Sequence, residues 1–114
     1  EVVEEIFQFP NTMAMWQGCE NSACSDKKLY EFMSKNIEYP AIAKEAGIQG
    51  KVFIKFIIDK DGSIQQSELI KGVHETIDRE ALRMIKKMPD WQPAEHNGRK
   101  VKSYFTIPIN FKLQ

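Results

Sequence analysis

The amino-acid sequence predicts an α+β domain, in which a three-stranded antiparallel sheet carries helices packed on one face. Residues 51–58 alternate between apolar and mixed positions, as a strand with one buried face does. A returning strand follows at 63–71, a helical pattern at 77–88 and a last alternating strand at 100–112. A right-handed crossover through the helix places the last strand beside the first. The predicted strand order is therefore 2-1-3, which leaves the last strand at an edge.

The first strand and its turn form the expected centre of the sheet. Its fully apolar face, which should point into the core, consists of Val52, Ile54, Phe56 and Ile58. The opposite face is mixed and should be partly wet, as antiparallel sheets allow. Residues 59–62 have turn chemistry, with Gly62 able to adopt a positive φ. The second strand alternates poorly, which predicts a β-bulge around Gln66 or Ser67.

Two helices are expected before the first strand. Ser25 or Asp26 can cap a helix that begins directly afterwards and ends before Pro40, because the residue before a proline avoids the α region. Its apolar stripe, expected to face the core, is Leu29, Phe32, Met33 and Ile37. A short helix should then span residues 40–46, with Gly47 just beyond its end.

The helix at 77–88 has the clearest amphipathic pattern. Thr76 can cap its start, and Pro89 stops it. Its expected buried stripe is Ile77, Ala81, Leu82, Ile85 and Met88.

The last strand contains a proline. One face is apolar apart from Ser103, and Pro108 lies on the other. Because proline cannot donate to a ladder, this strand should lie at a sheet edge with residue 108 facing outward, or carry a bulge there.

Composition excludes several functions. The 114 residues suggest one domain, and 16 basic against 16 acidic residues give zero net charge, which argues against a nucleic-acid-binding protein. No segment approaches the ~20 apolar residues of a membrane span. The chain begins with Glu1 rather than Met, so we expect a processed product or fragment from which an anchor or targeting segment has been removed. No Ser/His/Asp set, paired carboxylates or phosphate loop is present, so neither catalysis nor a cofactor is expected.

No metal site is expected either. A calcium loop starting at Asp59 would need glycine at its sixth position and glutamate at its twelfth, where Ile64 and Ile70 stand. The two histidines, His74 and His96, lie in no recognisable ligand spacing.

Residues 1–25 are interpreted as an irregular N-terminal extension that precedes a domain at 26–114. Cys19 and Cys24 are too far apart for a Cys-x-x-Cys redox motif. A local disulfide is the favoured interpretation, with two free thiols as the alternative. Trp16 is interpreted as a packing anchor over this loop rather than as an exposed contact. The residues apolar enough to lie on the domain as an added extended segment are Val2, Val3, Ile6, Phe7 and Phe9.

The ordered motifs of residues 36–113 resemble the C-terminal domain of TonB-type energy transducers, the Bacteroidetes type in particular. The motifs that carry the resemblance are Tyr39-Pro40, Gly47-Ile48-Gln49-Gly50, Asp61-Gly62, Met88-Pro89-x-Trp91-x-Pro93, Asn97-Gly98 and Phe105-x-Ile107-Pro108-Ile109-x-Phe111. The cysteines lie outside the resemblance.

The resemblance implies a periplasmic domain tethered to an inner-membrane helix that works with an ExbB/ExbD-like motor. Such a domain captures the TonB box of an outer-membrane TonB-dependent transporter by β-augmentation of its last strand. The oxidising periplasm would favour the disulfide. The implied partner-binding residues are Asn36, Glu38, Lys102, Tyr104, Thr106, Pro108 and Asn110. Either Asn36 or Glu38 would take the place of the polar residue, usually glutamine, that the family has before Tyr-Pro.

Two alternatives accompany this hypothesis. The same domain could be the sensor end of a membrane-bound metallopeptidase. An exposed edge strand also permits a homodimer, which Lys102 and Lys112 would limit.

Overall fold

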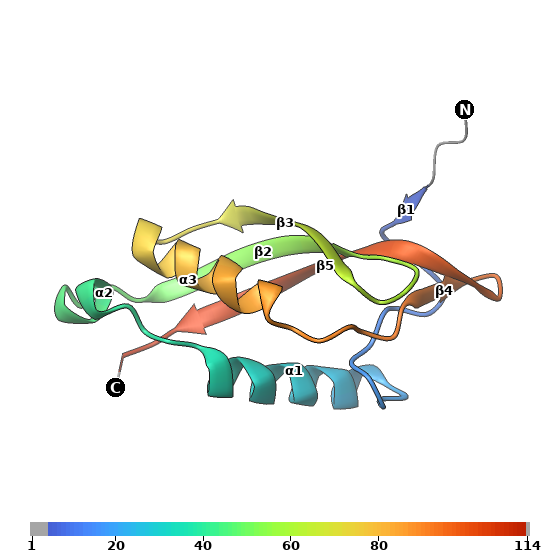
Figure 1. Cartoon of the computed structure of the whole chain (residues 1–114), viewed down its shortest axis with the longest axis horizontal. Coiled ribbons are helices and arrows are strands. Elements are labelled where there is room, and N and C mark those ends of the chain that lie inside the picture. Colours follow the sequence, from blue (N-terminus) through green and yellow to red (C-terminus); the bar gives the residue numbers. More distant parts are fainter. Residues whose placement is uncertain (1–4, 114) are drawn as a thin grey trace.

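The computed structural model describes residues 5–113, so Val2 and Val3 lie outside the described residues. The molecule is elongated, 50 × 33 × 19 Å, with a long twisted sheet and helices alongside it (Figure 1). Its elements, in chain order, are β1 (Ile6–Phe7), α1 (Ser22–Asn36), α2 (Ala41–Glu45), β2 (Gly50–Ile58), β3 (Ile64–Lys71), α3 (Glu75–Lys86), β4 (Ala94–His96) and β5 (Arg99–Phe111).

The sheet has the order β1-β5-β2-β3, with β4 paired to β5. The predicted order 2-1-3 corresponds to β3-β2-β5 and is confirmed, as is the α+β class. Two short strands lie outside this order: β1, which falls in the apolar segment expected to lie extended on the domain but whose pairing was not predicted, and β4, which was not predicted. β1 pairs with β5 in parallel, and β4 forms a hairpin with β5. Two or three residues are too few to display a period of two, which is why pattern alone misses them.

The core lies between the sheet and α3. The predicted inward face of β2 is fully buried, as are Ile77, Ala81, Met84 and Ile85 of α3. Trp91, also fully buried, packs its ring 6.0 Å from that of Phe56, and Trp16 packs against it at 5.6 Å. The prediction that Trp16 is a packing anchor is therefore confirmed. Each large apolar side chain buried here stabilises the fold by about 1.5–3 kcal/mol.

The β2–β3 turn requires glycine at position 62. Gly62 has φ of 90°, and a Cβ there would lie 1.9 Å from the backbone oxygen of Trp91. The Trp91 N–H in turn donates to the Gly62 oxygen at 2.8 Å. The turn is thus joined directly to the segment that follows α3.

β3 carries the predicted bulge. Its register against β2 shifts between Lys55 and Ile57, and again between Phe53 and Ile54. Gln66 has φ of 46°, which is unusual for a residue other than glycine. The first shift therefore lies at the predicted residues, whereas the second, at Ile70, was not predicted.

The start of α1 is earlier than predicted. Its N-cap is Asn21, whose Oδ1 accepts the Cys24 N–H at 2.8 Å, so neither Ser25 nor Asp26 is the cap. Ser25 is buried instead, and its Oγ accepts the Trp16 N–H at 2.8 Å. Residues 22–25, which the sequence analysis assigns to the irregular extension, are helical because Asn21 can satisfy the first free amides.

The N-caps of the other two helices also differ from the predicted ones, by one or two residues. His74, not Thr76, caps α3, since its Nδ1 accepts the Thr76 N–H at 3.3 Å. Pro40 is the N-cap of α2 rather than its first helical residue. As predicted, Gly47 lies just beyond the end of this short helix, and its φ there is 69°.

Candidate binding site at the edge of strand β5

The pairing of β5 with β2 is regular along its whole length. It runs without a register shift from Gly50 opposite Phe111 to Ile58 opposite Ser103. Pro108 lies within this stretch, opposite Phe53. Of the two predicted alternatives for Pro108, the structure therefore shows the outward-facing position and not the bulge.

The position of Pro108 determines which backbone groups face outward. In an antiparallel pair, directly opposed residues alternate between hydrogen-bonded and non-hydrogen-bonded pairs. A proline fits only the second kind, so residues two positions away along β5 have the same orientation. The N–H groups of Tyr104, Thr106 and Asn110 therefore point away from β2. Within residues 5–113, no second strand pairs with residues 104–111.

An apolar groove accompanies this open edge. α1 runs alongside β5 (Figure 1), and between them lies a groove of about 420 Å³. On the helix side, Tyr30 is 69% exposed, although its ring is large and largely apolar. The groove is lined by Tyr30, Met33, Ser34, Ile37, Pro108, Ile109, Asn110 and Lys112. An extended peptide paired with β5 would have this wall beside it.

The residues that the sequence analysis names on β5 are distributed along the edge. Thr106, Pro108 and Asn110 are exposed, and they lie on the stretch without a second partner strand. Tyr104 is half-buried, with the Lys55 Nζ 4.0 Å from its ring centroid. Lys102 is opposite Ile6 of β1, so it lies where the edge is already covered.

Asn36 and Glu38 do not line this groove. The Asn36 side chain donates to the Phe32 oxygen of its own helix at 2.8 Å. The Glu38 side chain is exposed and lies 3.8 Å from Arg83 of α3. Ile37, between them, is the residue of this segment that lines the groove.

Glu80 of α3 holds the segment that connects α1 to α2. Its side chain is 8% exposed, and it accepts the Glu38 N–H at 2.6 Å and two Arg83 N–H groups at 2.5 and 2.7 Å. Burial raises the pKa of Glu80, but the hydrogen bonds from Arg83 and from the Glu38 backbone, with the charges of Arg83 and Lys87, outweigh it and lower the pKa. Arg83 also donates to the Asn36 oxygen at 3.3 Å. The end of the groove is therefore fixed by ionised groups.

Sequence reasoning missed the helix side of the groove, formed by Tyr30, Met33, Ser34 and Ile37, and also Ile109 and Lys112 on the strand side. Met33 and Ile37 were assigned to the core because they share a stripe with Leu29 and Phe32. Only Leu29 of this stripe is buried, while the other members are half-buried against the core. The available signal was Tyr30, an aromatic residue three positions before Met33 and seven before Ile37, which widens the apolar stripe on one side.

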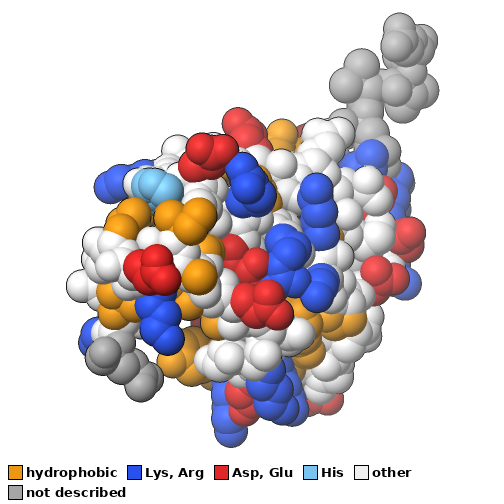
Figure 2. Space-filling model, turned by 60° about the vertical axis from the view of Figure 1, so that its left-hand side comes forward, with side chains coloured by type: hydrophobic (Ala, Val, Ile, Leu, Met, Phe, Trp, Pro, Cys, Tyr) orange, Lys and Arg blue, Asp and Glu red, His pale blue; other side chains and the backbone are white. Residues whose placement is uncertain are grey.

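Neither the charges on one face of the domain nor the metal-ligating residues within 5–113 indicate another site. On the face that Figure 2 shows, acidic and basic side chains are interspersed, so this face has no large field of one sign. Residues 5–113 contain no cluster of three or more His, Cys, Asp or Glu side chains that could hold a metal ion. No helix in that range is long and apolar enough to cross a membrane.

The fold and this edge define a small α+β domain that presents one regular, open strand beside a helix. A family model, Gram-negative bacterial TonB protein C-terminal, matches residues 35–113. The chain belongs to this family, which confirms the resemblance to the TonB C-terminal domain.

Relatives and solved structures agree with this assignment. The chain is 37% identical over 79 residues to Protein TonB of Vibrio cholerae, covering 67% of this chain and 31% of that protein. It is 29% identical over 77 residues to Protein tonB2 of Pseudomonas aeruginosa, covering 67% of this chain and 28% of that protein. The solution structure of the Helicobacter pylori TonB-CTD matches with a TM-score of 0.63 at 28% identity, covering 86% of this chain and 87% of that one. The chain thus spans less than a third of the two curated relatives.

Proposed function

We propose that this domain captures a short extended segment, the TonB box, of an outer-membrane TonB-dependent transporter on the edge of β5. Pulling on that segment would couple the inner-membrane proton motive force to nutrient uptake. The domain would act by binding and by transmitting force, without catalysing a reaction.

The observation that carries this proposal is the open stretch of β5. A regular strand edge with outward N–H and C=O groups pairs readily with an added strand. Tyr104, Thr106 and Asn110 offer donors, and Pro108 adds an acceptor oxygen. Shear along a strand loads several hydrogen bonds at once, which suits a domain that transmits force.

The cellular setting follows from family membership and is part of the proposal. The domain would lie in the periplasm, joined through upstream sequence to an inner-membrane helix and an ExbB/ExbD-like motor. The Cys19–Cys24 disulfide supports an oxidising compartment.

Titration calorimetry with synthetic TonB-box peptides from the transporters of the same cell tests the proposal. The Thr106→Pro variant removes an outward donor and adds a ring at the edge, so we expect binding about tenfold weaker or more, with the fold intact. Thr106→Ala keeps the N–H and should bind within about twofold of the unmodified domain.

A control on the opposite edge makes the comparison sharper. Leu69 of β3 lies opposite Ile54, whose backbone N–H and C=O groups face β5 and not β3. Leu69 and Ile54 are therefore a non-hydrogen-bonded pair, and the Leu69 N–H points away from the sheet. Leu69→Pro should leave peptide affinity unchanged. No binding of any such peptide by the unmodified domain, or equal binding by the folded Thr106→Pro variant, would contradict the proposal.

The open edge also allows a second copy of the chain to occupy it. Sedimentation velocity on the unmodified domain and on Thr106→Pro tests this possibility. A dimer that dissociates in the variant and is displaced by peptide would show that the two occupants compete.

A further inference from the structure

The N-terminal extension is attached firmly to the rest of the domain. Thr12 exchanges two backbone hydrogen bonds with Glu95, each 3.0 Å, and Met15 does the same with Gln92 at 3.0 and 2.7 Å. Asn11 Oδ1 accepts the Asn97 N–H at 2.8 Å. The extension is therefore placed by hydrogen bonds of its own, although it lies outside residues 35–113 that match the family.

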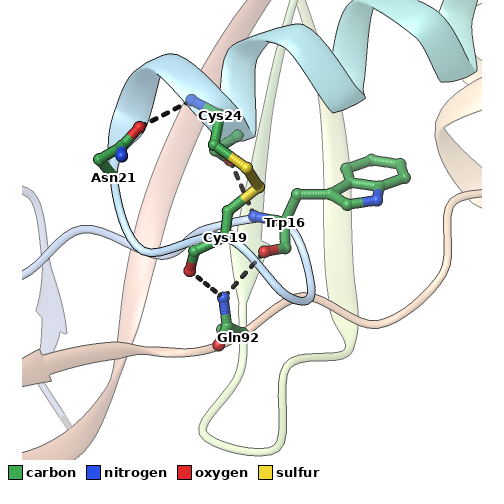
Figure 3. Close-up of a disulfide and its surroundings, with 6 residues drawn as sticks. Trp16, Cys19, Asn21, Cys24 and Gln92 are labelled. Carbon is green, nitrogen blue, oxygen red and sulfur yellow. Dashed lines mark hydrogen bonds between the residues drawn. A yellow bond between two sulfur atoms is a disulfide. The ribbon is translucent and has the colours of Figure 1, made fainter.

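A second anchor lies where the extension meets α1. Cys19 and Cys24 are joined by a disulfide beside the first turn of α1 (Figure 3). Gln92 Nε2 donates to the backbone oxygens of Trp16 and Cys19 at 2.8 and 2.7 Å, and these bonds are visible in the same view. The segment between β1 and α1 is thus tied at both ends.

β1 ends the open part of the β5 edge. Ile6 pairs with Lys102 and Phe7 with Ser103 in parallel, and the strand stops there. The Phe7 ring lies 4.6 Å from that of His96, which supports this position. A captured strand would therefore have about eight residues of β5, 104–111, available to it.

The chain turns away from β5 directly after β1 and leaves apolar side chains at the boundary. Phe9 is 85% exposed and Met13 is 40% exposed. With Gln8, Tyr104, Phe105 and Thr106 they line a hollow of about 270 Å³ at the point where the open edge begins. Covering an exposed phenylalanine with an apolar partner lowers the free energy, so this side chain favours binding.

We infer that the extension forms one end of the peptide site. β1 determines where the captured strand ends, and Phe9 and Met13 hold a bulky apolar side chain of that strand at its end beside Tyr104. The occupant must be extended, because the adjoining backbone of β5 offers only strand pairing. This inference rests on the proposed function and adds to it a requirement on the ligand: an apolar residue at one terminal position of the paired segment.

The test uses the intact chain, the TonB-box peptide that binds it most tightly, and variants of both. Phe9→Ser and Met13→Ser together should weaken binding about tenfold, since each side chain loses apolar contact. Ile42→Ser, at an exposed apolar site on α2, is the matched control and should bind as the unmodified chain does. Because Phe9 and Ile42 are largely exposed, the variants should fold.

Peptides in which each residue in turn is replaced by serine identify the contact. Serine at one terminal apolar position of the peptide should weaken its binding to the unmodified chain about tenfold. The same replacement should change the peptide's affinity for the Phe9/Met13 variant little. Unchanged affinity of that variant, while Thr106→Pro abolishes binding, would overturn this inference and leave the proposed function standing. Failure of every peptide to bind would overturn both.

Discussion

Two strands of the sheet, β3 along one side and the stretch 104–111 of β5 along the other, present open edges in different ways. β3 shifts register twice against β2, with Gln66 in the left-handed region. β5 keeps one register over nine opposed pairs and has an apolar groove beside it. Bulges and twisted edges hinder the addition of another strand. The sheet therefore has one irregular edge, which disfavours pairing with another strand, and one regular edge. Only the regular edge is suited to bind an extended peptide.

The two edges also differ in what surrounds them. β3 exposes the apolar side chains of Leu69 and Ile70. Along β5, α1 and the N-terminal extension each add a wall of apolar side chains. The specificity of a bound peptide would therefore come from segments that are not part of the sheet.

The largest effect on stability should follow from breaking the hairpin that brings β3 to β2. Gly62→Ala forces a Cβ against the Trp91 oxygen at a positive φ, so we expect a loss of about 3 kcal/mol or more of unfolding free energy. Urea denaturation measures it. Gly47→Ala is the control: its φ of 69° is also positive, but a Cβ would have nothing within 4 Å, so the loss should be about 1 kcal/mol. Equal losses would show that the contact with Trp91 is unimportant.

A smaller effect should follow from loosening the end of the β5 groove. Glu80→Gln removes the charge that holds Arg83 and the Glu38 N–H and should cost about 2 kcal/mol at pH 7. The pKa of Glu80 is lower in the folded than in the unfolded state, so as pH falls the unfolded chain is protonated at higher pH than the folded one. The stability of the domain therefore decreases as pH drops below about 4.5, the ordinary pKa of glutamate. The variant and the unmodified domain should therefore converge at low pH.

Glu75→Gln controls for the loss of any carboxylate on α3. Glu75 pairs with Arg79 in an exposed i,i+4 contact, and its removal should cost less than about 0.5 kcal/mol. A difference between Glu80→Gln and the unmodified domain that persists unchanged to low pH would refute the role of the ionised carboxylate.

The smallest effect concerns the covered end of β5. Ser103 is fully buried, and among residues 5–113 its Oγ has no hydrogen-bond partner. Ser103→Ala removes this group and should stabilise the domain by about 1 kcal/mol, as thermal denaturation would show. Loss of stability instead would reveal a hydrogen bond to an ordered water.

Much of this difference between the edges could be predicted from the sequence. Pro108 in an alternating strand indicated an edge, and the poor alternation near Gln66 indicated the bulge. The walls of the groove could not be predicted. Phe9, Met13 and Tyr30 lie far from β5 in the chain, so their positions beside it depend on tertiary pairing that no local period records.

The cap at Asn21 illustrates the other kind of miss. Several polar residues, among them Asn21, Ser22 and Ser25, suit a helix start, and local propensity does not choose between them. The hydrogen bond from the Trp16 N–H to the buried Ser25 Oγ and the Cys19–Cys24 disulfide are tertiary or covalent features that accompany the earlier start.

Backbone amide hydrogen exchange with and without a bound TonB-box peptide tests the central claim most directly, because it reports both edges in one sample. The peptide should slow exchange at Tyr104, Thr106 and Asn110 of β5 and leave Leu69 of β3 unchanged. Slowed exchange at Leu69, or none along residues 104–110 at saturating peptide, would contradict the assignment of the binding edge to β5.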